Sequence, residues 1–438
     1  MFDGYSALDF IVVIALCASS AFLSNIGAAV FHDGIRPVIP EFIEGRMKRP
    51  ELASIAFGLS VGFIASVGIA FTISTKLLNP WLLFLSTDIL GIIAPKKWLA
   101  PIFGGIWGAL CLSSLGMINT ALTSLPVDMI TGLGALGDPV IAGFSLFPLI
   151  AIFRQFGAKK GIISTVVTLL VRQIVVITVP NMTDVLQMLT GIVILIGLAI
   201  FTDVKAKKEQ KETAVVEEGE NIFTQRINRI KKNLPFLMIT GGLIAVACNI
   251  GVFAGSEVSI YTLADAYKSV DPSTTSELVN QAALAETMRS LGFIPLIATT
   301  AITTGVYGVA GLCFVYPIGY LMPNPIFAAI AGAAVIFIEV MVLGLIGKGF
   351  EKLPSIKDAS DSIRSSMITA MEFALLIGSV NASIQMGGTT GFFICAMVYF
   401  INELTGTKIM KMAIGPVGAI TAGILLNILH VVGLFPLL

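Results

Sequence analysis

Long apolar runs separated by short polar breaks fill most of the chain. Nine runs reach the roughly twenty residues that a helix needs to cross a hydrocarbon layer, at 8–31, 53–74, 100–122, 161–179, 185–201, 234–254, 325–347, 365–384 and 412–435. Three shorter runs, at 81–94, 139–153 and 389–402, are bounded by proline or glycine and fit short spans, tilted spans or half-helices. The pattern predicts an all-α polytopic membrane protein with about 12 transmembrane helices.

One further apolar stretch, 291–322, fits none of these spans. Basic residues cluster between the runs, at 36–49, 96–97, 154–160, 205–232, 348–364 and 408–411. Cytoplasmic loops carry an excess of lysine and arginine, and all these clusters share one side only if 291–322 leaves and re-enters the membrane from the other. We therefore expect a re-entrant or broken-helix hairpin there, and both termini on the outer side.

The polar segment 202–233 divides the chain into an N-terminal membrane half, 1–201, and a C-terminal membrane half, 234–438, which contains the hairpin. With an odd number of spans before the segment, the second half begins on the opposite side of the membrane. That arrangement is typical of inverted-repeat transporters, although no repeat is visible residue by residue.

The end of the same segment has an amphipathic pattern. Residues 221–232 place Phe223, Ile227 and Ile230 on one helical face among basic side chains. Such a pattern favours a short helix that lies on the inner membrane surface. We expect 202–233 to be a cytoplasmic linker that ends in this interfacial helix.

Composition narrows the possible functions. Apolar residues make up 56% of the chain and charged residues 12%, about half the charged share of a soluble domain, which excludes a soluble enzyme, a secreted disulfide scaffold and a disordered protein. The 27 basic residues balance 27 acidic ones, so no overall field attracts nucleic acid. Because the cysteines lack C-x-x-C spacing, and neither H-E-x-x-H nor a P-loop occurs, we expect no metal, no cofactor and no ATP hydrolysis by a P-loop.

Two apolar stretches contain helix breakers beside polar residues. The first, 289–304, holds Pro295 and a series of threonines, and the second runs from Pro126 through Asp128 to Pro139. Non-helical backbone at membrane depth is tolerated only where protein or a water-filled cavity satisfies its polar groups. We interpret both stretches as broken helices that line a cavity, the alternative being the ordinary packing glycines and prolines of membrane helices.

Several ionisable residues lie within apolar runs, where a charge costs several kcal/mol. They are Asp88, Arg172, Glu339 and Glu372. One of these acids could simply neutralise Arg172 in a structural pair. The remaining acids then need a functional explanation.

The densest group of polar residues precedes the threonine-rich break. It contains Ser256, Glu257, Asn280, Gln281, Glu286 and Arg289. Glu286 and Arg289 are three residues apart and share one face of a helix. As a site, the arginine would bind a carboxylate or phosphate and Glu286 would accept an amine or a coupling proton. The alternative is a solvated ion pair at the outer interface.

The first span ends at His32 and Asp33. Histidine beside a carboxylate can shuttle protons or bind metal, but the simpler interpretation is a helix-ending cap with interfacial charges.

Four strings of this sequence resemble the YhfT family of bacterial inner-membrane proteins. They are Ala-Val-Phe-His-Asp-Gly-Ile-Arg-Pro at 29–37, Gly-Ser-Glu-Val-Ser-Ile at 255–260, Asn-Gln-Ala-Ala-Leu-Ala-Glu at 280–286 and Gly-Phe-Ile-Pro-Leu-Ile-Ala-Thr-Thr-Ala at 292–301. The resemblance covers essentially the whole length and implies a multi-pass protein of the inner (cytoplasmic) membrane. It supplies no assigned binding residues.

A transporter explains the broken, threonine-rich segments and their buried acids best, since an enzyme would need a nucleophile–base pair or metal cluster and a scaffold needs no buried charge. We predict an ion-coupled carrier for a small anionic or zwitterionic metabolite, with elevator-like movement as a hypothesis. Its site would lie where 291–322 meets 126–139. The predicted substrate-binding residues are Arg289, Thr299, Thr300, Ser256, Asn280 and Gln281, and the predicted ion-coupling residues are Glu286, Glu257, Asp128, Asp88, His32 and Asp33.

Two alternatives stay open. One is a sugar-translocating IIC-like component of a phosphotransferase system, which would need a separate cytosolic IIB-like partner because the 202–233 linker is too short to be a fused domain. The other is an intramembrane enzyme. Besides its substrate we expect membrane lipid as a partner, and interfaces rich in small residues permit a homodimer without requiring one.

Overall fold

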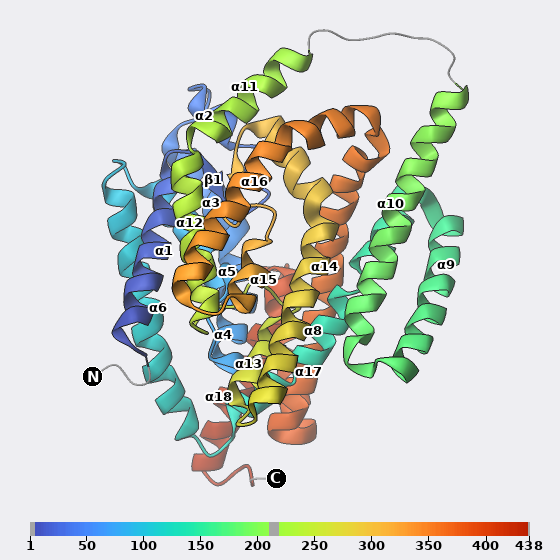
Figure 1. Ribbon diagram of the computed structural model, residues 1–438. Coiled ribbons are helices and arrows are strands. Elements are labelled where there is room, and N and C mark those ends of the chain that lie inside the picture. Colours follow the sequence, from blue (N-terminus) through green and yellow to red (C-terminus); the bar gives the residue numbers. More distant parts are fainter. Residues whose placement is uncertain (1–4, 210–218, 437–438) are drawn as a thin grey trace.

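The computed structural model describes residues 5–209 and 219–436, and its regular elements are helices apart from two short strands (Figure 1). The N-terminal half holds α1 (Ala7–Asn25), β1 (Ala29–Val30), α2 (Ile39–Ile43), α3 (Arg49–Phe63), η1 (Ile64–Gly68), α4 (Ile69–Thr75), α5 (Pro80–Ile93), α6 (Leu99–Thr123), α7 (Met129–Gly134), α8 (Gly137–Phe144), α9 (Phe147–Thr178), η2 (Pro180–Met182) and α10 (Thr183–Glu209). The C-terminal half holds α11 (Gly219–Lys232), α12 (Leu234–Asn249), α13 (Ile260–Lys268), α14 (Pro272–Thr304), β2 (Tyr307–Gly308), α15 (Val315–Leu321), α16 (Pro325–Lys352), α17 (Pro354–Leu404) and α18 (Lys411–Val431). The predicted all-α class is confirmed.

Fewer helices than expected are continuous spans. Among the described residues, 7 helices are long and apolar enough to cross a membrane, or 8 if the bent pair Thr224–Lys232 and Leu234–Asn249 forms one span. The predicted 12 crossings therefore stay a prediction. Several apolar runs form short helices beside a break, such as α5 with 14 residues, because an apolar run inside a protein can be buried without being one long helix.

Two long helices contain sharp turns at glycines. In α17 the backbone leaves helical geometry at Gly387 and Gly388, where φ of Gly388 is 54°, and in α9 it does so at Gly157, where φ is 81°. Positive φ is accessible to glycine at no steric cost. The part of α17 after this turn packs closely on the residues just before it, since a methyl group added at Gly391 would overlap the carbonyl oxygen of Ser383.

Two breaks in the helices of the first half are paired with two breaks in the second half. After α1 the chain is extended in β1, which pairs in parallel with β2, the extended segment after α14. Between α4 and α5, Leu78 forms a parallel bridge with Phe253, which lies between α12 and α13. Each of these two breaks in the first half is thus hydrogen-bonded to a break in the second half.

The helices around these breaks have matching neighbours. Helix α1 packs on α5 and α6, and α12 packs in the same way on α15 and α16; α5 packs on α3, and α15 on α14. Helices α1 and α12 also contact each other and run antiparallel, because Ser19 meets Thr240 while Phe22 meets Phe236. Two sets of helices, α1–α6 and α12–α16, therefore share one pattern of contacts.

The remaining apolar stretch, 291–322, is divided among three elements. Its first part is the end of α14, a 33-residue helix that already begins at Pro272 and ends where Gly305 adopts φ of 67°. Its second part comprises β2, a short turn and α15. The break therefore lies at 305–314, later in the chain than the proline and glycine that suggested it, because Pro295 is accommodated inside α14.

The polar segment is more helical than expected. Helix α10 continues to Glu209, and residues 210–218 lie outside the described part of the chain. Helix α11 packs on α14 and α16, with Ile230 buried and Ile227 packed against the core. The side chain of Phe223 is outside the description. The start of α1 and the end of α18 both lie in the half of the molecule away from α11 (Figure 1), while the side of the membrane on which the termini lie stays a prediction.

Candidate functional site

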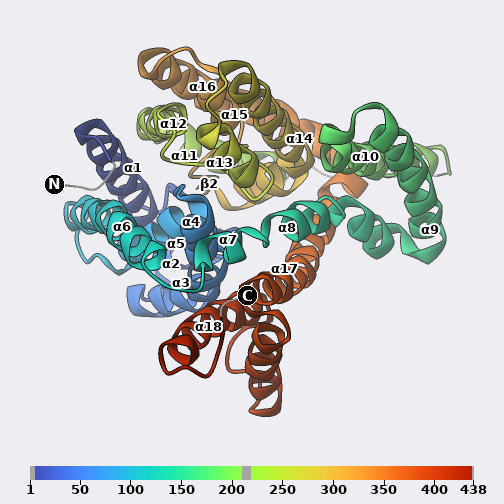
Figure 2. The same ribbon diagram turned by 90° about the horizontal axis from the view of Figure 1, so that it is seen from below.

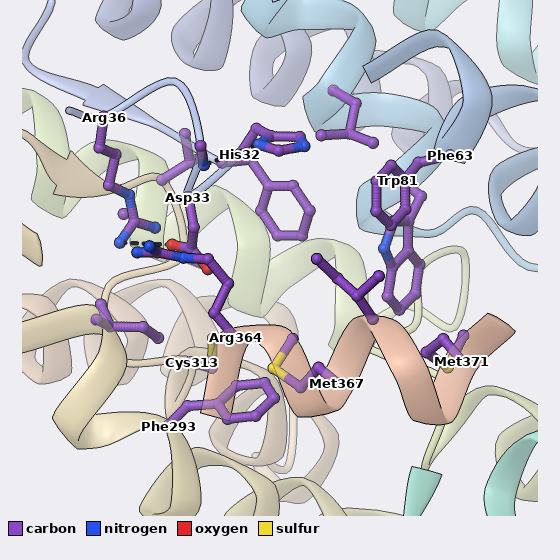
Figure 3. A pocket seen from close by; sticks show the side chains of 18 of the residues that line it. His32, Asp33, Arg36, Phe63, Trp81, Phe293, Cys313, Arg364, Met367 and Met371 are labelled. Atoms are coloured by element: carbon purple, nitrogen blue, oxygen red, sulfur yellow. Dashed lines mark hydrogen bonds and ion pairs between the residues drawn. The ribbon is translucent and has the colours of Figure 1, made fainter. Parts of the chain in front are cut away.

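A cavity of about 300 Å³ lies where the breaks meet. Its walls come from the segments after β1 and β2, from α3, α5, α8, α14, α17 and α18, and from the loop before α13. The acidic and basic lining residues are His32, Asp33, Arg36, Glu257, Arg289 and Arg364. The large apolar lining residues include Phe31, Phe63, Trp81, Phe144, Phe293, Met367, Met371 and Met412. Figure 3 shows many of these side chains around one space.

Arg36 and Asp33 form one charged corner of the cavity. The Arg36 Nη1 atom lies 3.0 Å from Asp33 Oδ1, and Arg36 Nε donates to the Val30 carbonyl at 3.4 Å. A methyl group added at Gly308 would lie 2.9 Å from Arg36 Nη2, so the guanidinium also packs closely against the break that contains β2. Arg36 therefore packs against both breaks while it lines the cavity.

In the second charged group, two carboxylates contact the guanidinium of one arginine, Arg289. Arg289 Nε lies 3.2 Å from Glu257 Oε1, and Arg289 Nη1 lies 3.9 Å from Glu286 Oε2. Glu286 also accepts hydrogen bonds from the hydroxyls of Ser256 and Ser259. All three charged side chains are buried, with exposed fractions of 5% for Arg289, 1% for Glu257 and 0% for Glu286. The predicted ion pair of Glu286 and Arg289 is therefore enclosed by the protein rather than solvated.

Arg289 lies on the cavity-facing side of α14. Arg289, Phe293 and Ile297 follow one another at intervals of four residues, so they share one helical face and all line the cavity. The guanidinium carbon lies 4.5 Å from the centre of the Phe293 ring, a cation–π contact that orients the group.

Several polar atoms in these walls have no hydrogen-bond partner among the described residues. They are Glu257 Oε2, Arg289 Nη1 and Arg364 Nε, together with Asp33 Oδ1 and Arg36 Nη1, whose contact with each other is an ion pair. Buried polar groups in native proteins are nearly always satisfied. Arginine donors and carboxylate acceptors turned toward one cavity are suited to a ligand that carries both an anionic group and a hydrogen-bond donor.

Two buried carboxylates outside the cavity lining accept hydrogen bonds from the backbone of the breaks. Asp88, on α5, accepts hydrogen bonds from Ser24 Oγ and from the backbone amides of Phe31 and His32. Glu339, on α16, accepts from the Tyr307 hydroxyl and the backbone amide of Leu312, both at 2.9 Å. Each carboxylate thus satisfies backbone that has left helical geometry.

The structure separates the predicted substrate-binding residues. Arg289 lines the cavity and Ser256 lies behind it on Glu286. Thr299 and Thr300 line a different hollow, together with Thr303, Thr304 and Arg364. Asn280 and Gln281 line a third hollow beside the turn between α9 and α10.

The predicted coupling residues fall into three places. Glu286 and Glu257 contact Arg289, whereas His32, Asp33 and Asp88 belong to the first break. Asp128 is the N-cap of α7, and the Thr131 hydroxyl and nearby backbone amides donate to its carboxylate, which lowers its pKa. A carboxylate of this kind stays ionised near neutral pH, so we do not carry Asp128 forward as a proton site.

The cavity does not lie at the expected meeting of 291–322 with 126–139. Of the second stretch, α7 packs on α4, α17 and α18, and it is Phe144 of α8, beyond this stretch, that reaches the cavity. Arg172 forms an ion pair with Asp184 at 2.6 Å and donates a hydrogen bond to Gln187. The acid that neutralises Arg172 therefore lies on α10 and is not Asp88, Glu339 or Glu372. Because α9 and α10 are antiparallel neighbours, the partner lies only twelve residues along the chain.

Sequence reasoning missed Arg36, Arg364 and the aromatic residues as parts of the site. Arg36 and Arg364 counted only as basic loop residues, although Arg36 lies in the string that also contains His32 and Asp33. Arg364, Met367 and Met371 recur at helical spacing on α17, a pattern that by itself indicates only a packed face. Within the described residues, no group of three or more His, Cys, Asp and Glu side chains could hold a metal ion.

Comparison with known proteins places the chain in a family. The YhfT family, described as a protein of unknown function, matches residues 9–435. The chain is 51% identical over 430 residues to the uncharacterized protein YhfT of Escherichia coli (strain K12), which covers 98% of each chain. No solved structure matches. The family match spans nearly the full length and the identity is high, so this chain belongs to the YhfT family.

Proposed function

We propose that this protein is a proton-coupled carrier for a small anionic or zwitterionic metabolite. The observation that carries the proposal is the central cavity, which lies between two chain breaks and exposes an arginine shared by two buried carboxylates. Ionisable groups at membrane depth are costly and usually mark substrate or ion pathways.

Helix α14 connects three hollows that together suggest a path. Asn280 lines the hollow near the α9–α10 turn, Arg289 lines the central cavity, and Thr303 lines the hollow beside α2 and α17. At 1.5 Å per residue, a helix of 33 residues is about 50 Å long, enough to pass through a membrane. Arg364 lines both the central cavity and the last hollow, so its side chain stands between them.

The matching units α1–α6 and α12–α16 support an alternating-access mechanism. Their central helices run antiparallel and their breaks are cross-connected, as expected of an inverted repeat whose site lies at the interface of its halves. When the molecule is seen from below, α9 and α10 lie at the right-hand edge of these units, and α18 and the end of α17 lie at the lower edge (Figure 2). Movement of the two broken units against these outer helices is the elevator-like version of the proposal.

Charge balance at Arg289 explains why a proton would accompany the anion. Arg36 is paired with Asp33, and Arg289 contacts two carboxylates. With Glu257 and Glu286 both ionised, the negative charge at Arg289 exceeds the positive charge, so an anion that binds Arg289 would be repelled. Protonation of one carboxylate removes this repulsion, because like charges in a buried site disfavour each other's ionisation. Glu286 is the candidate, since it is buried behind the cavity wall, whereas Glu257 lines the cavity itself.

Glu286→Gln is therefore expected to make uptake independent of the proton gradient, since the amide mimics the protonated acid. The measurement is uptake of an anionic substrate into liposomes with and without an inward proton gradient. Glu372→Gln is the matched control, because Glu372 lies on α17 outside the central cavity, and it should keep the gradient dependence. Uptake by Glu286→Gln that still follows the gradient would reject Glu286 as the proton carrier.

The carrier proposal itself is tested by the accessibility of the two outer hollows. Single cysteines at Ser276 and Thr303, in a chain without the native cysteines, are expected to react with a membrane-impermeant maleimide in opposite proportions as pH or substrate is changed. Lys97→Cys, in the exposed turn after α5, should react equally in all conditions. Simultaneous, unchanging reactivity at both positions would contradict alternating access, and uptake that requires a phosphorylated partner would favour the phosphotransferase alternative.

A further inference from the structure

The central cavity has two unlike ends. In Figure 3, Arg36, Asp33 and Arg364 gather at one end, while Trp81, Phe63 and Met371 lie at the other. The charged end joins the two breaks, whereas the apolar end is built by α3, α5 and α17. A ligand that fills the cavity must therefore have a charged part and an apolar part.

Aromatic rings dominate the apolar side. Phe31, Phe63, Trp81, Phe144 and Phe293 come from five different segments of the chain and all line the cavity. Aromatic side chains bury much surface and prefer offset or edge-to-face contacts with other rings. This wall also contains Met367, Met371 and Met412. Their flexible thioethers make favourable contacts with aromatic rings.

The lining disfavours a highly hydroxylated solute. A sugar acid would place several hydroxyl groups against Trp81, Phe63 and Met371, where the side chains supply few hydrogen-bond partners. Polar groups buried without partners cost free energy. The cavity of about 300 Å³ also lies at the small end of ligand sites, which limits the ligand to one compact ring system.

We propose that the substrate class is a compact aromatic or heteroaromatic carboxylate. The carboxylate would bind the guanidinium groups of Arg289 and Arg364, whose Nη1 and Nε atoms respectively donate no hydrogen bond in the described structure, and the ring would lie against Trp81 and Phe63. A ring or side-chain N–H would donate to Glu257 Oε2, which has no hydrogen-bond partner in the described structure. This inference rests on the proposed carrier function and specifies what that carrier takes.

The test compares three probes that separate charge from ring. Phenylacetate has both, benzyl alcohol has the ring without the charge, and gluconate has the charge without the ring. Thermal unfolding of the purified full-length protein is followed over a concentration series of each, since a ligand that binds the native state raises the unfolding temperature. Phenylacetate is expected to stabilise at a concentration at least tenfold below that needed for the other two.

A pair of tryptophan variants locates the binding. Trp81→Leu keeps an apolar side chain but removes the large ring, and it should weaken the phenylacetate response at least tenfold. Trp98→Leu is the matched control, because Trp98 is 60% exposed and does not line the cavity, and it should respond like the unmodified chain. Phe63→Leu provides a second cavity variant should Trp81→Leu fail to fold, with the same expected weakening.

The possible results separate this inference from the carrier proposal. Stabilisation by gluconate that is lost in Arg289→Met would overturn the aromatic class and leave a carrier of hydrophilic anions. Equal stabilisation by benzyl alcohol and phenylacetate would overturn the role of the carboxylate. Absence of any response to phenylacetate would overturn the inference, whereas the carrier proposal would fall only if the two outer hollows also showed no reciprocal accessibility.

Discussion

Arg289→Met is expected to destabilise the fold by about 3–5 kcal/mol and to abolish anion uptake, because removing one partner of a buried charge pair leaves the other uncompensated. In this protein two carboxylates would be left, since Arg289 lies 3.2 Å from Glu257 and 3.9 Å from Glu286. Methionine keeps most of the side-chain volume, so the effect reports the charge rather than a cavity. Thermal unfolding and liposome uptake measure the two effects separately.

The double variant Arg289→Met, Glu257→Gln distinguishes the contribution of Arg289 to stability from its role in anion uptake. Neutralising Glu257 should restore much of the lost stability, because one unpaired charge has gone, while uptake should stay absent. If Arg289→Met alone were as stable as the native chain and still took up anions, both the ion cluster and the anion site would be wrong.

Asp88→Ala is expected to produce the second large effect, a loss of several kcal/mol of stability together with loss of uptake. The Asp88 carboxylate accepts from the Ser24 hydroxyl at 2.7 Å, the Phe31 amide at 2.8 Å and the His32 amide at 3.0 Å. A buried donor left without a partner costs about 1–3 kcal/mol. The two amides belong to the segment that forms one wall of the cavity, so the site should loosen as the fold weakens.

Asp128→Ala is the matched comparison for Asp88→Ala. Asp128 also accepts backbone hydrogen bonds, but it caps α7 in an exposed position. Loss of an N-cap costs about 1 kcal/mol, so its unfolding temperature should fall only slightly and uptake should persist. Equal losses from Asp88→Ala and Asp128→Ala would show that Asp88 does not support the break in the way proposed. Asp88→Asn, which retains one acceptor oxygen, should fall between the two.

The cross-connected breaks explain why so many polar residues lie near the centre of an apolar chain. Extended backbone at this depth needs hydrogen-bond partners that a helix would supply internally. The backbone of one break supplies some of these partners to the other, in the pairing of β1 with β2 and of Leu78 with Phe253. The carboxylates of Asp88 and Glu339 supply others, because they accept hydrogen bonds from backbone amides. Cys313 adopts φ of 77° in the second break, a conformation that is strained for a residue with a side chain. The buried acids therefore stabilise the backbone conformation that shapes the cavity, and they also contribute negative charge near it.

Sequence reasoning found parts of the site from local spacing alone. Glu286 and Arg289 lie one helical turn apart, so their contact follows from the geometry of α14. Thr299 and Thr300 lie on the same helix as Arg289, yet they line another hollow, because ten residues of helix separate positions by about 15 Å. Proximity in sequence therefore overestimated how many of these residues share one site.

The sequence by itself determined the class of the protein, through apolar runs that water could not solvate, and the family, through long matching strings. It also determined the local pairs, since a helix fixes which residues three or four positions apart meet. Only the tertiary structure decided which breaks meet, that Arg36 and Arg364 turn toward the same space as Arg289, and that Asp184 neutralises Arg172. These contacts join segments from different elements, and no periodicity within one segment encodes which other segment will satisfy its polar groups.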